Sequence, residues 1–264
     1  MIDLRASGIA YSVLARRRTV YAPKPESFGH RTTRWAHLIG LEEMPPPRLF
    51  PAPDQDAAAE KLVPPGPPVI AFGPTANWLG KIWPIERFAE LGRRLSASDG
   101  PYPGARIAVV GAAGDRDDVA PLLSSVPEER RVDLIGTDLM TAYAALARCA
   151  LYVGNDSGLL YISVAADIPA VGLVGPSLHL FGPQRPPLVA PWAPKAAIAR
   201  TPITYEEFIS AEGYDHKTTG SLMGSLTVDM VAATVDDLLA RLAERAAPTA
   251  TATRSDPMVP AARG

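Results

Sequence analysis

Cysteine is almost absent from this sequence, because Cys149 stands alone among the 264 residues. A single thiol excludes a disulfide within the chain, and its apolar helical surroundings predict that Cys149 packs in a core. Histidine is also scarce, and the four histidines show no spacing typical of a zinc site. The sequence therefore fits a reducing compartment and predicts no bound metal.

An excess of charge is missing as well, since the formal net charge is −2 at pH 7. No general attraction to nucleic acid follows, and the short basic run Arg16–Arg18 is typical of solvated surface. No apolar run reaches the roughly 18 residues of a membrane span, and Met1–Arg5 lacks the pattern of a signal peptide. We expect a cytoplasmic protein that does not bind nucleic acid.

Proline, by contrast, is abundant and unevenly placed, and many of the 28 prolines crowd residues 45–68. Proline has no backbone N–H to donate to a helix or a strand ladder, so residues 51–68 are predicted to form a proline-rich linker. Inside that stretch, Asp54–Leu62 consists of good helix formers that follow an acidic cap. A short helix is expected there.

From Val69 onward, aliphatic runs alternate with amphipathic segments. The predicted strands and helices are Val69–Phe72, Pro84–Leu95, Arg106–Gly111, Asp115–Leu123, Val132–Ile135, Leu139–Arg148, Ala150–Val153, Gly158–Ala166, Ala170–Val174, Ala196–Arg200 and Val228–Ala246. Continuous aliphatic strands separated by helices indicate an α/β fold whose parallel sheet is covered on both faces. We predict a Rossmann-like domain over residues 69–246 and a disordered tail over 247–264.

Two loops are predicted to open at the same edge of that sheet, because each follows the end of a strand. In Asn155–Gly158, the tetrad NDSG, either Asp156 or Ser157 can cap the next helix, whose amide donors suit a phosphate. The loop Gly73–Pro84 carries Lys81, whose ammonium can neutralise a diphosphate. Each loop also has an ordinary explanation, a helix cap or a solvated lysine. Only their combination indicates a diphosphate site.

Two segments carry a family resemblance: GPTANWLGKIWPIERFAEL, residues 73–91, and ARCALYVGNDSGLLYISVAADIPAVGLVGPS, residues 147–177. They resemble the nucleotide-sugar-binding half of glycosyltransferase family 9, the lipopolysaccharide heptosyltransferases. The resemblance implies a GT-B fold of two facing Rossmann-like domains, with residues 1–50 as an incomplete acceptor-side domain. It also implies an inverting transfer of heptose or a similar sugar from a nucleotide diphosphate sugar to a cell-envelope glycan such as lipopolysaccharide core. The resemblance implies no metal or other cofactor. It does imply a peripheral contact with the inner membrane surface.

The same resemblance assigns donor-binding roles to Thr75, Asn77, Lys81, Asp115, Asp156, Ser157, Gly158, Leu159 and Tyr161. Lys81 is expected to neutralise the leaving diphosphate, with backbone from residues 157–159 beside the phosphates. Asp156 is expected to hold sugar hydroxyls, because a carboxylate next to phosphate is repelled. Asp115 is expected to face a ribose hydroxyl, with compensation of a helix dipole as its alternative role.

The chain departs from the family pattern at two points. Tyr161 stands where family members usually carry histidine, and a phenol does not supply a cation at neutral pH. The family's first strand and loop, which hold its acidic general base, have no counterpart here, so the general base is unknown. We favour an incomplete chain over a partner that supplies the missing half or a protein that has become a binding module.

Three other functions compete with this interpretation. Asp115, Asp117 and Asp118 suggest a metal-dependent transferase, but acidic residues are common at a helix start. A non-catalytic nucleotide-sugar-binding protein would explain the absent base and Tyr161. An NAD-linked oxidoreductase is disfavoured, because no G-x-G-x-x-G joins a first strand to its helix.

Overall fold

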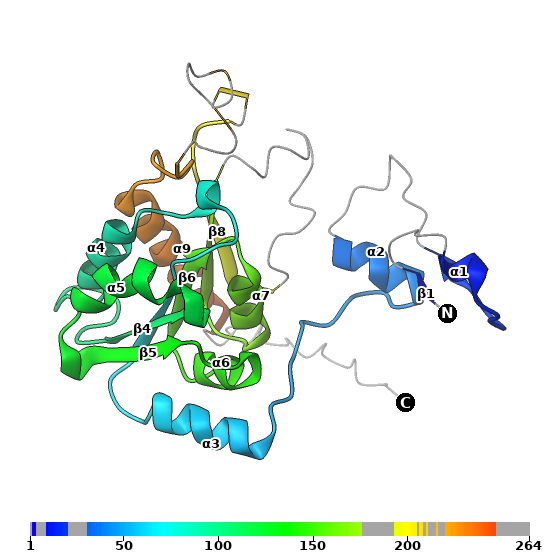
Figure 1. Ribbon diagram of the computed structural model, residues 1–264, viewed down its shortest axis with the longest axis horizontal. Helices are drawn as coiled ribbons and strands as arrows, with labels where there is room; N and C mark the ends of the chain where they lie inside the picture. The colour runs from blue at the N-terminus through cyan, green and yellow to red at the C-terminus, as the bar shows by residue number, and fades with distance from the viewer. Residues whose placement is uncertain are drawn as a thin grey trace, which may run out of the picture.

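A six-stranded sheet forms the centre of the computed structural model, which describes residues 2–3, 9–20, 31–175, 193–204, 206–207, 210, 215 and 220–246. The strand order is β5-β4-β3-β6-β7-β8, and every neighbouring pair is parallel (Figure 1). The strands are β3 Val69–Gly73, β4 Arg106–Gly111, β5 Arg131–Ile135, β6 Leu151–Asn155, β7 Ala170–Val174 and β8 Ala196–Arg200. The predicted parallel α/β sheet is confirmed.

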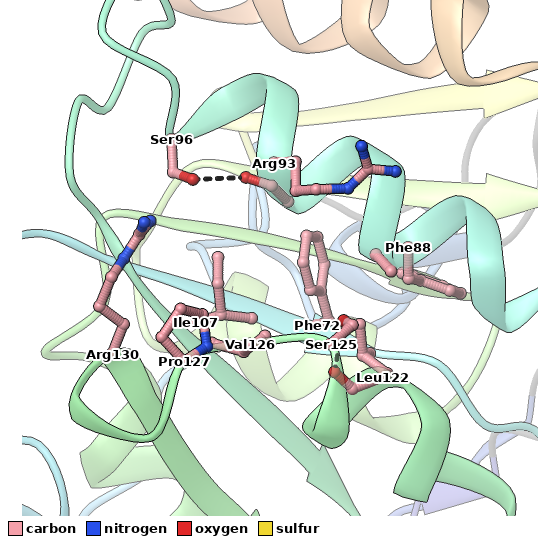
Figure 2. A pocket seen from close by; sticks show the side chains of 12 residues that line it. Phe72, Phe88, Arg93, Ser96, Ile107, Leu122, Ser125, Val126, Pro127 and Arg130 are labelled. Carbon is pink, nitrogen blue, oxygen red and sulfur yellow. Dashed lines mark hydrogen bonds between the residues drawn. The ribbon is translucent and has the colours of Figure 1, made fainter.

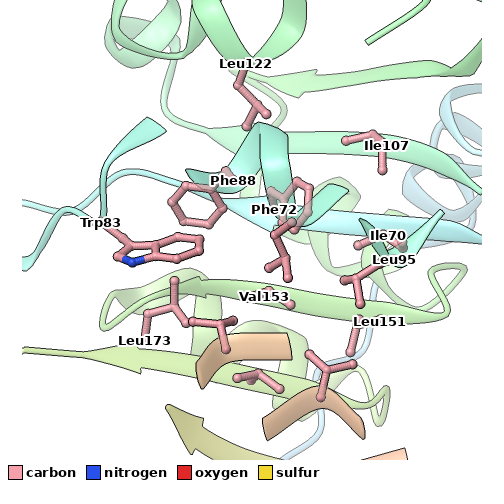
Figure 3. Close-up of a cluster of buried hydrophobic side chains, with 14 of the residues drawn as sticks. Ile70, Phe72, Trp83, Phe88, Leu95, Ile107, Leu122, Leu151, Val153 and Leu173 are labelled. Carbon is pink, nitrogen blue, oxygen red and sulfur yellow. The ribbon is translucent and has the colours of Figure 1, made fainter. Parts of the chain in front are cut away.

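Helices lie on both faces of the sheet. They are α3 Pro53–Leu62, α4 Ile85–Leu95, α5 Arg116–Ser124, α6 Leu139–Leu146, α7 Gly158–Ala165 and α9 Val228–Ala246. Successive strand residues point to opposite faces, so Ile70 and Phe72 pack with α4, α5 and α9, as Figure 3 shows in part. Val69 and Ala71 pack with α3, α6 and α7 on the other face. Burial on both faces explains why these strands read as unbroken aliphatic runs.

The strand order reverses between β3 and β6. The chain moves outward from β3 through β4 to β5, and then returns to the opposite side of β3 with β6. Because the strands are parallel, their carboxyl ends meet at one edge, and the register pairs Gly73 with Gly154 near that edge. A reversal of this kind opens a crevice outside the strand ends, where α/β proteins bind ligands.

The proline-rich stretch 51–68 contains the predicted helix, which runs over Pro53–Leu62 as α3 and lies across α6 (Figure 1). Ala59 of this helix and Val63 just after it are buried in the same cluster as the sheet. The side chain of Arg148 donates to the Val63 carbonyl oxygen at 2.7 Å. Part of the predicted linker therefore packs as a layer of the sheet domain.

Four short elements precede α3: β1 Ile2–Asp3, α1 Ile9–Ser12, β2 Thr19–Val20 and α2 Arg31–Leu38. β1 and β2 form a parallel two-stranded sheet, and Tyr11 and Leu14 after β1 are exposed. The predicted tail, residues 247–264, lies outside the described residues, and the predicted domain boundaries stay predictions. Within the described part of the chain, no helix combines the length and the apolar character needed to cross a membrane.

Most predicted boundaries coincide with those of the structure, and the others differ by one or two residues. Local contacts explain where several of these elements begin. Pro84 precedes α4 as its cap residue instead of belonging to the helix. The carboxylate of Asp138 accepts from the amides of Met140 and Thr141, both at 3.1 Å, which fixes the start of α6 at Leu139. The helix predicted from Asp115 begins as a 3-10 turn over Ala113–Asp115, and α5 itself starts at Arg116.

Candidate functional site

A hollow of about 750 Å³ lies at the crevice between the ends of β3 and β6. Its lining comes from four loops or helix starts at the carboxyl edge of the sheet: Thr75, Ala76, Asn77, Lys81, Val110, Gly111, Ala112, Asp115, Thr137, Leu139, Ala142, Asp156, Ser157, Gly158, Leu159 and Ile162. All the predicted donor-binding residues except Tyr161 are in this set. The two loops singled out in the sequence therefore converge, as predicted.

Asn155 joins these two loops. Its side chain is fully buried, accepts from the backbone amide of Trp83 at 3.1 Å and donates to the Pro74 carbonyl oxygen at 2.7 Å. Both ends of the loop that carries Lys81 are therefore tied to the last residue of β6. This role of Asn155 could not be predicted from the sequence, because an amide at the end of a strand has the same sequence pattern whether it faces solvent or a neighbouring loop.

The segment 221–226 holds the same loop from the other side. The indole N–H of Trp83 donates to the Leu226 carbonyl oxygen at 2.7 Å, and the amide of Leu222 donates to the Gly80 carbonyl oxygen at 3.1 Å. The Ser221 hydroxyl also donates to the Ile82 carbonyl oxygen. Because Trp83 is fully buried and packs edge-on against Phe88, the backbone around Lys81 is fixed.

Lys81 and Asp156 form an ion pair across the hollow. Their Nζ and Oδ2 atoms are 2.6 Å apart, and the two side chains are 26% and 25% exposed. One residue comes from the loop after β3 and the other from the loop after β6. The two groups predicted to bind phosphate and sugar hydroxyls are therefore in contact with each other.

Ser157 occupies the cap position of α7, but its hydroxyl makes no capping hydrogen bond, so the prediction of a side-chain cap there is wrong. Its Oγ is buried and has no hydrogen-bond partner in the part of the chain that the structure describes. Among the described residues, no atom outside the adjoining residues and the backbone of α7 lies within 4 Å of where a Cβ on Gly158 would be. The start of α7 therefore has open space at Gly158 and a buried hydroxyl at Ser157.

Tyr152 lies directly beneath this corner, on β6. Its phenol is fully buried, and its hydroxyl has no hydrogen-bond partner among the described residues. Burial raises the pKa of Tyr152 well above its ordinary value, and the nearby Ser157 hydroxyl lowers it by less, although the two do not form a hydrogen bond. Gly73 and Gly154 make room for the ring, because a Cβ would lie 2.0 and 2.3 Å from the phenol oxygen.

Asp115 connects the loops after β3 and β4. Its Oδ2 accepts from the Thr75 hydroxyl at 2.8 Å and from the backbone amide of Ala112 at 2.9 Å. The second bond stabilises the turn before α5, in keeping with the alternative role at a helix start. The hydroxyl hydrogen of Thr75 is engaged as well, so Thr75 can offer a ligand only its oxygen lone pairs in this arrangement.

We call Lys81, Asp156 and Ser157 the polar side of the hollow. Its apolar side consists of Val110, Leu139, Ala142 and Ile162. The sequence analysis missed these four residues. Their position in the sequence could have indicated them. They lie at or after the ends of β4, β5 and β6, and these strand ends meet at the same sheet edge as the two polar loops.

Tyr161, Asp117 and Asp118 do not line the hollow. Tyr161 lies on α7 with 38% of its surface exposed. Asp117 and Asp118 are exposed in the first turn of α5. Among the described residues, no three histidine, cysteine or acidic side chains are grouped to hold a metal ion.

A second crevice lies between α4 and α5, away from the carboxyl edge (Figure 2). Its volume is about 40 Å³, and Phe72, Ile107 and Leu122 form much of its lining. The Ser96 hydroxyl beside it donates to the Gly92 carbonyl oxygen at 2.7 Å. The space is too small for a nucleotide.

Comparison with known proteins identifies the family. The sequence model of glycosyltransferase family 9 (heptosyltransferase) matches residues 5–212, most of the chain. The chain belongs to glycosyltransferase family 9. The matched range includes both polar loops and every residue that lines the hollow. The resemblance noted in the sequence is confirmed.

Curated relatives of the chain include two proteins named as heptosyltransferases. Lipooligosaccharide heptosyltransferase 2 of Haemophilus influenzae is 33% identical over 138 residues, which cover 50% of this chain and 36% of the relative. Lipopolysaccharide heptosyltransferase 2 of Salmonella typhimurium is 32% identical over 155 residues, which cover 56% of this chain and 41% of the relative. The alignments therefore span well under half the length of these relatives.

Solved structures support the fold. ADP-heptose lipopolysaccharide heptosyltransferase II of Escherichia coli has a TM-score of 0.59 and 25% identity, covering 86% of this chain and 66% of that one. A family 9 glycosyltransferase of Veillonella parvula has a TM-score of 0.68 and 18% identity, covering 91% and 72%. The E. coli heptosyltransferase WaaC with ADP has a TM-score of 0.57 and 19% identity, covering 84% and 60%. The predicted Rossmann-like fold of the GT-B type is confirmed.

Proposed function

We propose that the hollow binds a nucleotide diphosphate sugar and that the protein is an inverting glycosyltransferase. The sugar would be heptose or a similar one, and the acceptor a cell-envelope glycan such as lipopolysaccharide core. The names of the relatives support this choice, since they include lipopolysaccharide heptosyltransferases and a heptosyltransferase with ADP. One observation carries the proposal: Lys81 and the start of α7 line the same hollow at the reversal of strand order.

The polar side suits the diphosphate. Amide groups at a helix start and the dipole behind them favour an anion, and α7 starts at Ser157, whose hydroxyl has no partner among the described residues. Lys81 brings a full positive charge to the same place. We assign phosphate contacts to these two residues and to the backbone of Gly158 and Leu159, with Thr75 and Asn77 beside them.

The apolar side suits the nucleoside. Val110, Leu139, Ala142 and Ile162 offer the apolar contacts that a flat base needs. Asp115 lines the hollow as well, and its Oδ2 holds Thr75 and the turn, so we assign its Oδ1 to a ribose hydroxyl. Tyr161 stands outside the lining and receives no direct donor contact in this arrangement.

The chemistry follows from these positions. An acceptor hydroxyl attacks the anomeric carbon from the face opposite the diphosphate, and the bond to the diphosphate oxygen breaks, which inverts the configuration. Negative charge grows on the leaving diphosphate, and Lys81 with the α7 amides stabilises that charge. A general base must take the proton of the acceptor hydroxyl. The carboxylates that line the hollow are Asp115 and Asp156, and both already accept hydrogen bonds.

This last observation favours a second candidate, a nucleotide-sugar-binding protein that does not catalyse transfer. The two candidates differ in one assay. The protein is incubated with ADP-heptose and a heptose-deficient lipopolysaccharide acceptor, and the glycan is analysed by mass spectrometry. A mass increase of one heptose supports the transferase, whereas donor binding without product supports the binding protein.

Calorimetric titration of ADP and AMP in EDTA tests the diphosphate site itself. We expect ADP to bind more tightly than AMP, and Lys81→Ala to weaken ADP binding by roughly ten- to a hundredfold, the scale of a hydrogen bond to a charged group. Lys61→Ala, an exposed lysine on α3, is the matched control. Equal affinities for ADP and AMP, or equal effects of the two alanine variants, would contradict the proposal. A requirement for Mn²⁺ would instead support a metal-dependent site.

The cytoplasmic location and the contact with the inner membrane surface stay predictions. Flotation of the purified protein with vesicles that contain anionic lipid measures the membrane contact directly.

A further inference from the structure

The ion pair between Lys81 and Asp156 joins two side chains whose backbones are fixed. Asn155, the neighbour of Asp156, is hydrogen-bonded to both ends of the Lys81 loop, and the Asp156 amide donates to the Leu173 carbonyl oxygen at 3.1 Å. The Gly80 carbonyl next to Lys81 accepts from Leu222. A ligand therefore cannot separate the two charges by moving the loops, and only the side chains can change partners.

A nucleoside diphosphate in the hollow would compete with Asp156 for the Lys81 ammonium. Both anions would lie near the same cation, and like charges at short range disfavour each other. A diphosphate that takes Lys81 leaves Asp156 without its 2.6 Å partner in a site where only a quarter of the side chain is exposed. Losing that partner costs free energy, because a partly buried carboxylate needs donors.

A sugar on the diphosphate changes this balance. Its hydroxyls are hydrogen-bond donors, and a carboxylate released by Lys81 can accept them in charge-assisted bonds. The hydroxyls of the donor sugar would thus give Asp156 new hydrogen-bond donors in place of the Lys81 ammonium. A diphosphate without a sugar offers no such replacement.

We propose that Asp156, through its ion pair with Lys81, selects nucleoside diphosphates that carry a sugar over those that have lost it. The inference rests on the proposed donor site and adds a specificity-determining role to it. Its consequence is a weaker hold on the nucleoside diphosphate product than on the donor, which favours exchange of product for fresh substrate.

The test is calorimetric titration of the wild-type chain and Asp156→Asn with ADP and with ADP-heptose. Removing the charge should tighten ADP binding roughly fivefold, the scale of one charge interaction in a partly exposed site, and should weaken ADP-heptose binding. The two affinities should move in opposite directions. Asp117→Asn, an exposed carboxylate on α5 outside the hollow, is the matched control and should change neither affinity.

Asp156→Glu separates charge from shape, because it keeps the carboxylate and should keep the weaker binding of ADP relative to ADP-heptose. If Asp156→Asn does not fold, as judged by its thermal unfolding, Asp156→Ser makes the same test with a smaller neutral side chain. If the affinities for both ligands fall together in the neutral variant, or do not change, the inference is wrong. The proposed donor site is not contradicted by either result. A wild-type chain that binds neither ligand would contradict the donor site and the inference with it.

Discussion

The two sides of the hollow are built differently. The polar side depends on buried, closely fitted groups: Asn155 between the loops, and the Tyr152 ring against Gly73 and Gly154. The apolar side is mixed, because Val110 and Ala142 are buried in the core whereas Leu139 is 57% exposed. Substitutions behind the polar side should therefore reduce both stability and binding, whereas substitution of the exposed Leu139 on the apolar side should reduce binding alone.

The largest effect is expected for Gly73→Ala. The new methyl group would lie 2.0 Å from the phenol oxygen of Tyr152, which is fully buried and has no space to withdraw. We expect a loss of about 3 kcal/mol in the free energy of unfolding, measured by urea denaturation. Gly158→Ala, where the described part of the chain leaves open space around the new methyl group, should change stability by less than about 0.5 kcal/mol. Equal losses in the two variants would contradict the close fit.

Asn155→Ala should have the next largest effect. It removes two hydrogen bonds and leaves the Trp83 amide and the Pro74 carbonyl buried without partners. The expected loss is about 2 kcal/mol in urea denaturation, with a parallel loss of ADP affinity because the Lys81 loop is no longer fixed. Asn77→Ala replaces an exposed amide of the same loop and should keep the stability of the parent. A stable Asn155→Ala variant that binds ADP normally would show that the loops do not need this link.

Leu139→Ala tests the apolar side. The side chain lies at the start of α6 and is largely exposed, so we expect almost unchanged stability. ADP affinity should fall roughly fivefold, the scale of about 1 kcal/mol of lost apolar contact with the base. Leu62→Ala, which truncates another partly exposed leucine at the end of α3, should leave ADP affinity unchanged. A large loss of stability in Leu139→Ala would contradict the expected difference, in which only the polar side contributes to stability as well as to binding.

Tyr152→Phe should have the smallest effect. The phenol hydroxyl is buried without a hydrogen-bond partner among the described residues, so its removal relieves a desolvation cost and breaks no bond. We expect stability equal to that of the parent or up to about 1 kcal/mol higher, measured by urea denaturation. A loss of more than about 1 kcal/mol would indicate that the hydroxyl has a partner in solution, such as an ordered water.

The sequence was sufficient to predict the parallel sheet and the convergence of the two polar loops. Both follow from local patterns: unbroken aliphatic strands such as Leu151–Asn155, and loops that come directly after strand ends. The contacts across the hollow could not be predicted, because they depend on side-chain placement between distant segments. Asn155 reaches Pro74 and Trp83, and Trp83 reaches Leu226, more than a hundred residues away in sequence.

The cap predicted at Asp156 or Ser157 is confirmed only in its position. Serine is a favoured cap residue and Ser157 stands at the cap of α7, but its hydroxyl makes no capping hydrogen bond and lies near Tyr152. The packing of α3 was also beyond the sequence pattern, because prolines around a short helix indicate a linker whether or not the helix finds a partner. Tertiary contacts decided both cases.

A crystal structure of the chain with ADP would show whether the hollow holds a diphosphate. We expect the diphosphate between Lys81 and the first amides of α7, with the base against Leu139 and Ile162. The Lys81 Nζ atom should lie nearer to a phosphate oxygen than to Asp156. ADP bound elsewhere on the protein, or in the hollow with its phosphates away from Lys81, would rule out the proposed diphosphate site.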